Sequence, residues 1–284
     1  MSKSKHMKRI FLLSFSILGI VSFAQTKKTS PEEVKASQII GFSNSIITLS
    51  NNHLGALRGY ESIINTAERN IKTLSNNIST RPFFVNCQSF EILPNQLTEY
   101  NTKLKTTPAF DDKTKIQSAV ASAQKNSKEA LQWCKNVSNY FSKETYKTDA
   151  GFTQFPAMQD SLINNTEKTF SSWQYASKLA SNAGNKAELL LLKGSKIGEF
   201  VIPMKSDLIA IDDIINDLNN ENISLSDIKE QIKTIQASIE KNKDISTKNT
   251  SKLSDVYYKE VYQNFYRESN TCVSYIDSFV QKIE

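Results

Sequence analysis

The side chains that could do chemistry in this chain are few and far apart. The sequence holds two histidines, His6 and His53, and three cysteines, Cys87, Cys134 and Cys272. A Ser-His-Asp or Cys-His arrangement needs an imidazole beside a nucleophile, and no nucleophile motif surrounds either histidine. If the N-terminal leader described below is removed with His6, His53 is the only imidazole left. We expect His53 to be a packing residue beside the apolar seam of a helix.

Metal-ligand spacings are also missing. The di-iron proteins built on helical bundles use a Glu-x-x-His motif, and Ser50 occupies the position three residues before His53. The scattered cysteines have none of the Cys-x-x-Cys spacing typical of zinc sites. Neither Gly-x-Gly-x-x-Gly nor Gly-x-x-x-x-Gly-Lys occurs, so no loop is predicted to cradle a phosphate. We therefore expect no catalytic residue, no metal and no cofactor.

Four carboxylates are the one acidic cluster, at Asp212, Asp213, Asp217 and Glu221. An EF-hand loop that starts at Asp217 needs Gly at its sixth position and Glu at its twelfth, where this chain has Asn222 and Ile228. The calcium motif therefore fails twice. We expect a solvated acidic helix end, and a metal-dependent hydrolase that uses these carboxylates is an alternative.

The three cysteines leave the disulfide pattern open. In an oxidising compartment one pair could bridge and leave one thiol over, and sequence cannot choose among the three pairings of Cys87, Cys134 and Cys272. Alternatively, Cys134 and Cys272 stand at apolar helix positions and could be small buried hydrophobic residues.

The most apolar stretch, FLLSFSILGIVSFAQ at residues 11–25, has the layout of a cleaved secretory signal. Four basic residues precede it, and it is shorter than the roughly 20 residues that a bilayer-spanning helix needs. It ends with small residues at Ser22 and Ala24, the two positions that a signal peptidase reads.

We predict a signal peptide over 1–24, cleavage between Ala24 and Gln25, and one all-helical domain over 25–284. An uncleaved anchor is the alternative, and Met7 could equally be the start. No lipobox cysteine follows the apolar stretch. The chain is expected to be exported by a bacterium, to the periplasm or the medium.

The basic character of the chain comes largely from this leader. The whole sequence has 35 basic and 29 acidic residues, and residues 1–24 hold four basic residues and no acidic one. Without them 31 basic residues face 29 acidic ones, a net charge of +2. A nucleic-acid-binding groove is therefore not expected.

Apolar residues recur at alternating spacings of three and four along most of the chain, which predicts amphipathic helices. We expect helices near residues 30–78, 93–104, 112–145, 156–182, 186–219, 224–240 and 252–283. The sequence is poor in turn residues, with eight glycines and six prolines. It predicts an all-α fold: an elongated antiparallel bundle of six or seven long helices with coiled-coil-like packing.

Residues 188–203 allow two interpretations. A β-hairpin that turns at Gly194-Ser195 would resemble the membrane tongue of some helical toxins. The 3,4 spacing, however, runs from Leu190 to Leu218 straight across Pro203. This register favours one helix over 186–219, kinked at the proline.

A tyrosine-rich patch, Tyr257, Tyr258, Tyr262 and Tyr266, lies near the C-terminus on more than one helix face. Tyrosine is enriched in binding surfaces, but filling of the core is the preferred interpretation.

Two stretches carry a family resemblance: IIGFSNSIITLSN at residues 39–51 and NFYRESNTCVSYIDSF at 264–279. Both resemble the terminal helices of the YiiG-like bacterial lipoproteins, a domain family of unknown function. The resemblance implies an exported, all-helical envelope protein with no assigned catalytic residues. The missing lipobox cysteine departs from that family and favours a soluble form.

These features lead to three functional hypotheses. The first is a non-enzymatic, exported binding protein of the bacterial envelope, with a protein or another envelope component as its partner. The second is a membrane-active, pore-forming-like protein that inserts residues 189–202. The third is the metal-dependent hydrolase. The first fits the missing catalytic constellation best.

Overall fold

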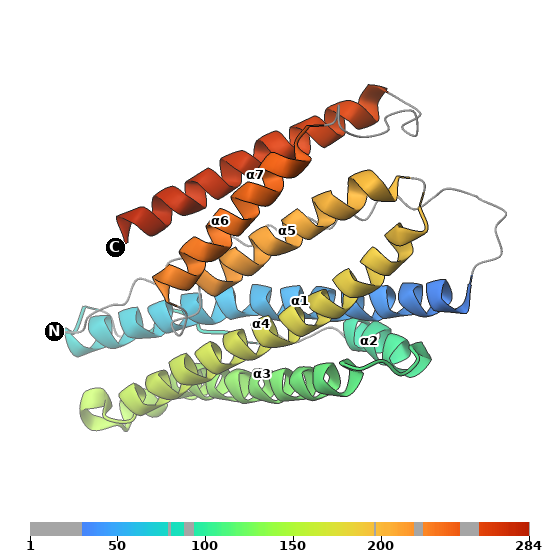
Figure 1. The fold of residues 1–284 in the computed structure, drawn as a ribbon. Helices are drawn as coiled ribbons and strands as arrows, with labels where there is room; N and C mark the ends of the chain where they lie inside the picture. Colours follow the sequence, from blue (N-terminus) through green and yellow to red (C-terminus); the bar gives the residue numbers. More distant parts are fainter. Residues whose placement is uncertain are drawn as a thin grey trace. The chain divides into compact units, whose positions relative to one another are not determined.

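The computed structural model describes residues 30–78, 81–87, 94–195, 197–218, 224–244 and 256–283. The side chains of residues 256 and 257 and the predicted cleavage site at Ala24 and Gln25 lie outside this part. Pro31 begins a unit that continues to the C-terminus. The expectation of an all-α fold is confirmed: seven α-helices and two short 3₁₀ turns, without a strand, make up the regular structure of the described residues (Figure 1).

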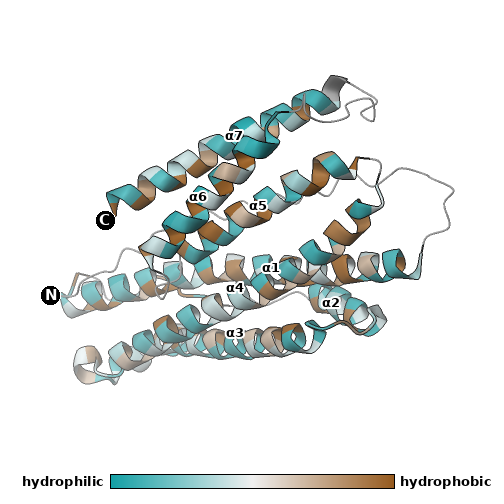
Figure 2. Cartoon of the chain, viewed as in Figure 1, coloured by the Kyte–Doolittle hydropathy of each residue, from teal (hydrophilic) through white to brown (hydrophobic). Residues whose placement is uncertain are grey.

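The helices are α1 (Pro31–Ser75), α2 (Pro94–Thr106), α3 (Lys113–Ser142), α4 (Phe155–Lys193), α5 (Gly198–Leu218), α6 (Leu225–Asn242) and α7 (Val256–Lys282), and the 3₁₀ turns η2 (Thr145–Lys147) and η3 (Ala150–Phe152) follow α3. Both polar and apolar residues occur along each helix (Figure 2), as expected for helices that bury one face. At 1.5 Å per residue, the 45-residue helix α1 is about 68 Å long. It continues through Gly55 without interruption.

The first four helices share two adjoining cores. One lies between the first half of α1, the first half of α3 and the second half of α4, and it includes Phe42, Val120 and Trp173. The other lies between the second half of α1, the second half of α3 and the start of α4, and it includes Tyr60 and Phe141. Helices α1 and α3 therefore run parallel to each other, and α4 runs antiparallel to both.

Close packing of α1 against α4 depends on a small residue. A Cβ atom at Gly184 of α4 would lie 3.1 Å from the Cβ of Ser43 on α1. The missing side chain lets the two backbones approach, and α4 stays helical across this position. A helix end near residue 182 was therefore a wrong prediction.

The predicted single helix over 186–219 is also wrong. Helix α4 ends at Lys193, and the chain turns at Gly194-Ser195 before α5 begins at Gly198. A Cβ atom at Gly198 would come within 2.5 Å of the Leu192 carbonyl oxygen, so only glycine fits this close return. Pro203 lies inside α5. The turn falls where the rejected hairpin placed it, but it joins two helices.

Helices α5, α6 and α7 enclose a third core, rich in isoleucine from α6. Ser224 caps α6, because its hydroxyl accepts a hydrogen bond from the Asp227 amide. The α4–α5 turn brings this group beside α4, where the Lys205 ammonium lies 2.7 Å from the Glu188 carboxylate. In the described part of the chain, no helix has the length and apolarity needed to cross a bilayer.

One buried carboxylate joins all three helices of this core. Asp207 of α5 accepts hydrogen bonds from Ser238 and Asn242 of α6 and from the Tyr266 hydroxyl of α7, the last at 3.1 Å. Tyr262 donates to the Asn242 carbonyl oxygen. Burial raises the pKa of the Tyr262 hydroxyl to about 12. Both buried tyrosines thus fill the core, as preferred from the sequence, and Tyr258 is half-buried.

We expect Asp207→Ala to lower the free energy of unfolding by about 3 kcal/mol, because it strands buried donors on α6 and α7. Urea unfolding followed by circular dichroism measures this loss. The control, Asp160→Ala, removes an exposed carboxylate of α4 and should change stability by less than about 0.5 kcal/mol. Equal effects of the two substitutions would contradict a role for Asp207 as the polar centre of this core.

Candidate functional site

Packing of α1, α3 and α4 brings a histidine and a serine together. His53 of α1 is 3% exposed, and its Nδ1 atom lies 3.1 Å from the Ser127 hydroxyl oxygen of α3. The Trp173 indole of α4 donates to that same oxygen at 2.8 Å. The imidazole stacks on the Trp173 rings with their centroids 4.1 Å apart. Ser127 was not predicted as a partner, because 74 residues separate the two positions and no local motif links them.

The geometry of this cluster does not activate the serine. The Ser127 hydroxyl lies 3.0 Å from the Ala123 carbonyl oxygen, to which it donates its only proton. One lone pair accepts from the Trp173 indole, and the other accepts from His53 in the tautomer that carries its proton on Nδ1, so in that tautomer neither remains to attack a substrate. The other nitrogen, Nε2, is buried without a hydrogen-bond partner among the described residues. His53 is therefore a core residue, as expected, but one with an unsatisfied atom.

The acidic cluster is less solvated than expected. Asp212, Asp213 and Asp217 are half-buried on α5, and burial raises the pKa of the Asp212 and Asp213 carboxyl groups. Asp217 pairs with Lys178 of α4 at 3.5 Å and accepts a hydrogen bond from Gln231 of α6. These contacts make the cluster part of the α4–α5–α6 packing. Glu221 lies outside the described residues.

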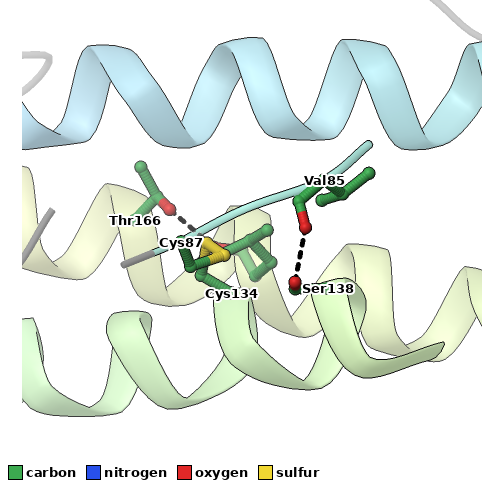
Figure 3. The surroundings of a disulfide bond; sticks show 6 residues. Val85, Cys87, Cys134, Ser138 and Thr166 are labelled. Carbon is green, nitrogen blue, oxygen red and sulfur yellow. Dashed lines mark hydrogen bonds between the residues drawn. A yellow bond between two sulfur atoms is a disulfide. The ribbon is translucent and has the colours of Figure 1, made fainter. Parts of the chain in front are cut away.

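A second candidate site is the extended segment of residues 81–87, which a disulfide fixes to the bundle. Cys87 is bonded to Cys134 of α3, with 5.9 Å between their Cα atoms, and both residues are buried. The Ser138 hydroxyl of α3 donates to the Val85 carbonyl oxygen (Figure 3). The structure thus selects one of the three pairings that the sequence left open, and it leaves Cys272 as a half-buried free thiol.

A buried asparagine fixes the same segment to α1. The Asn70 side chain accepts from the Phe83 amide at 2.7 Å and donates to the Phe83 carbonyl oxygen at 2.9 Å. This pair of bonds satisfies both the amide and the carbonyl group of one residue of an extended chain, much as a neighbouring strand would. The segment therefore has anchors on both α1 and α3.

Large apolar side chains near these anchors face solvent. Ile78, Phe83 and Phe84 are 72%, 54% and 81% exposed. The Arg69 guanidinium lies over the Phe83 ring, 5.7 Å from its centroid. A pocket of about 330 Å³ adjoins the ring of Phe84, and Lys135 is its charged residue. The other residues that line it are Asn86, Cys87, Ser138, Asn139 and Ser142. We call residues 81–87, together with Ile78 and this pocket, the anchored segment.

Comparisons with models of protein families, with curated proteins and with solved structures found no match to this chain. The similarity to the YiiG-like family thus stays a prediction. No group of three or more His, Cys, Asp or Glu side chains that could hold a metal ion occurs in the described residues.

The burial of His53 makes stability depend on pH. Burial lowers the pKa of the imidazole from 6.5 to about 4, so the folded protein favours the neutral ring. The part of the free energy of unfolding that depends on the neutral imidazole is complete above pH 6.5. It is lost as the pH falls from 6.5 through 4. At about 1.4 kcal/mol per pH unit, the loss is about 3 kcal/mol.

Chemical unfolding at pH 7 and pH 4 tests this prediction with His53→Gln, which cannot titrate. Because carboxyl groups also titrate in this range, the informative quantity is the stability of the parent minus that of the variant. We expect this difference to fall by about 3 kcal/mol between the two pH values. A constant difference would mean that the imidazole titrates normally in the fold.

The disulfide should contribute strongly to stability, because it closes a loop across 47 residues. We expect the double variant Cys87→Ser, Cys134→Ser to lose about 2–4 kcal/mol of unfolding free energy, measured by urea unfolding without reductant. Cys272→Ser is the matched control and should change stability far less. Non-reducing peptide mapping should recover Cys87 joined to Cys134, and a bond to Cys272 would contradict the structure.

Proposed function

We propose that this chain is an exported, non-enzymatic binding protein of the bacterial envelope, and that the anchored segment is its contact surface. The observation that carries the proposal is the contrast within this segment: its backbone is held by a disulfide and by Asn70, yet Phe83 and Phe84 stand exposed. A fixed backbone reduces the conformational entropy that binding costs. Aromatic side chains supply much of the energy at binding surfaces.

The secretory layout of the leader supports the exported location, and so does a buried disulfide, which is typical of oxidising compartments. The metal-dependent hydrolase alternative draws less support, because Asp217 pairs with Lys178 and Gln231 and the described acidic residues take part in helix packing. The membrane-active alternative assigns membrane insertion to residues 189–202. In the structure this stretch contains the end of α4, the turn at Gly194-Ser195 and the start of α5, and its Leu190 side chain is 44% exposed. We therefore prefer a non-enzymatic binding surface to the hydrolase.

Fractionation of the expressing bacterium tests this proposal. The parent protein should remain with washed envelopes, and Phe84→Ser should move most of it to the soluble fraction. Tyr275→Ser is the matched control, because Tyr275 is 73% exposed on α7 and should not affect retention. A parent protein that is fully soluble, or equal retention of the two variants, would contradict the proposal.

A further inference from the structure

Basic residues predominate around the anchored segment, although Glu68, Glu129 and Glu144 border the two stretches that form it. Residues 69–87 contain Arg69, Lys72 and Arg81 and no acidic residue, and residues 130–143 of α3 contain Lys135 and Lys143 and again none. The disulfide joins these two stretches. Five cations thus lie in the stretch that carries the exposed rings and in the part of α3 to which the disulfide joins it, although the chain beyond residue 24 is nearly neutral.

The apolar side chains stand out from the surface. Val85 and Cys87 point into the core and are buried, whereas Phe84 and Asn86 are exposed, because side chains alternate along an extended chain. The small pocket beside Phe84 is lined by Lys135 together with residues that carry hydroxyl and amide groups. These groups suit a phosphate, which binds ammonium, hydroxyl and amide donors.

We infer, on the basis of the binding function proposed above, that the anchored segment docks on an anionic phospholipid surface. Exposed phenylalanines enter the interface between head groups and acyl chains, and nearby lysines and arginines are attracted to anionic head groups. The Lys135 pocket takes a lipid phosphate beside the inserted Phe84 ring. An acidic polypeptide would need a groove to hold it, whereas these rings project into solvent. The lipid surface is therefore the better fit to the shape and the charge together.

Co-sedimentation of the purified full chain with lipid vesicles tests this inference. The parent should bind vesicles of phosphatidylcholine mixed with phosphatidylglycerol, should bind pure phosphatidylcholine weakly, and should lose affinity as salt is added. Phe84→Ser should weaken binding about tenfold, and Lys135→Gln about fivefold. The matched controls Tyr275→Ser and Lys233→Gln, on α7 and α6, should bind like the parent. All variants carry the same N-terminus, so any contribution from the leader is constant.

Two results would overturn the lipid assignment: no preference for anionic vesicles, or equal losses for the variants and their controls. Capture by soluble polyglutamate in place of vesicles would overturn it in favour of an acidic polypeptide. Envelope retention that depends on Phe84 without any lipid binding would remove the lipid and leave the binding function standing. Failure in both experiments would remove both.

Discussion

The parallel orientation of α1 and α3 is the constraint on which the first half of the molecule depends. Two consecutive long helices pack most simply when they run antiparallel through a short loop. Here both run antiparallel to α4, so the chain must travel back along α1 before α3 can begin. An extended chain covers about 3.3 Å per residue and a helix 1.5 Å. The path back along α1 uses both conformations: the extended residues 81–87 come first, and helix α2 follows them.

This return path explains why the anchored segment has its particular form. A single extended chain on a bundle has no neighbouring strand, so its peptide groups need other partners. Asn70 and Ser138 provide them, and the Cys87–Cys134 bond fixes the segment against α3. From Phe84 to Cys87, alternation then determines that Val85 and Cys87 are buried and that Phe84 and Asn86 are exposed. Packing does not determine that the exposed face carries Phe84, since a polar side chain would be more soluble there, and this residue therefore favours a role in binding.

The helices could be predicted because their periodicity is a local signal. The prediction failed at Gly194-Ser195, because α4 and α5 both need an apolar face and their stripes happen to continue in phase across the turn. The Cys87–Cys134 pair and the His53–Ser127 contact depend on how distant helices align. Only the packed structure supplies that alignment, so no single stretch of sequence could show either one.

The fold also requires that neighbouring helices pack in one particular lengthwise alignment. Stripes of similar apolar residues at 3,4 spacing can pack almost equally well after a slip of one turn, because the same kinds of contacts form again. A buried polar contact cannot survive such a slip without losing its partners, which costs far more than a repacked alanine or isoleucine. Ser127 joins α1, α3 and α4 through His53 and Trp173, and Asp207 joins α5, α6 and α7. We infer that these two polar centres select the native alignment, one in each group of three helices. Their burial costs desolvation free energy, which is the unfavourable side of this selection.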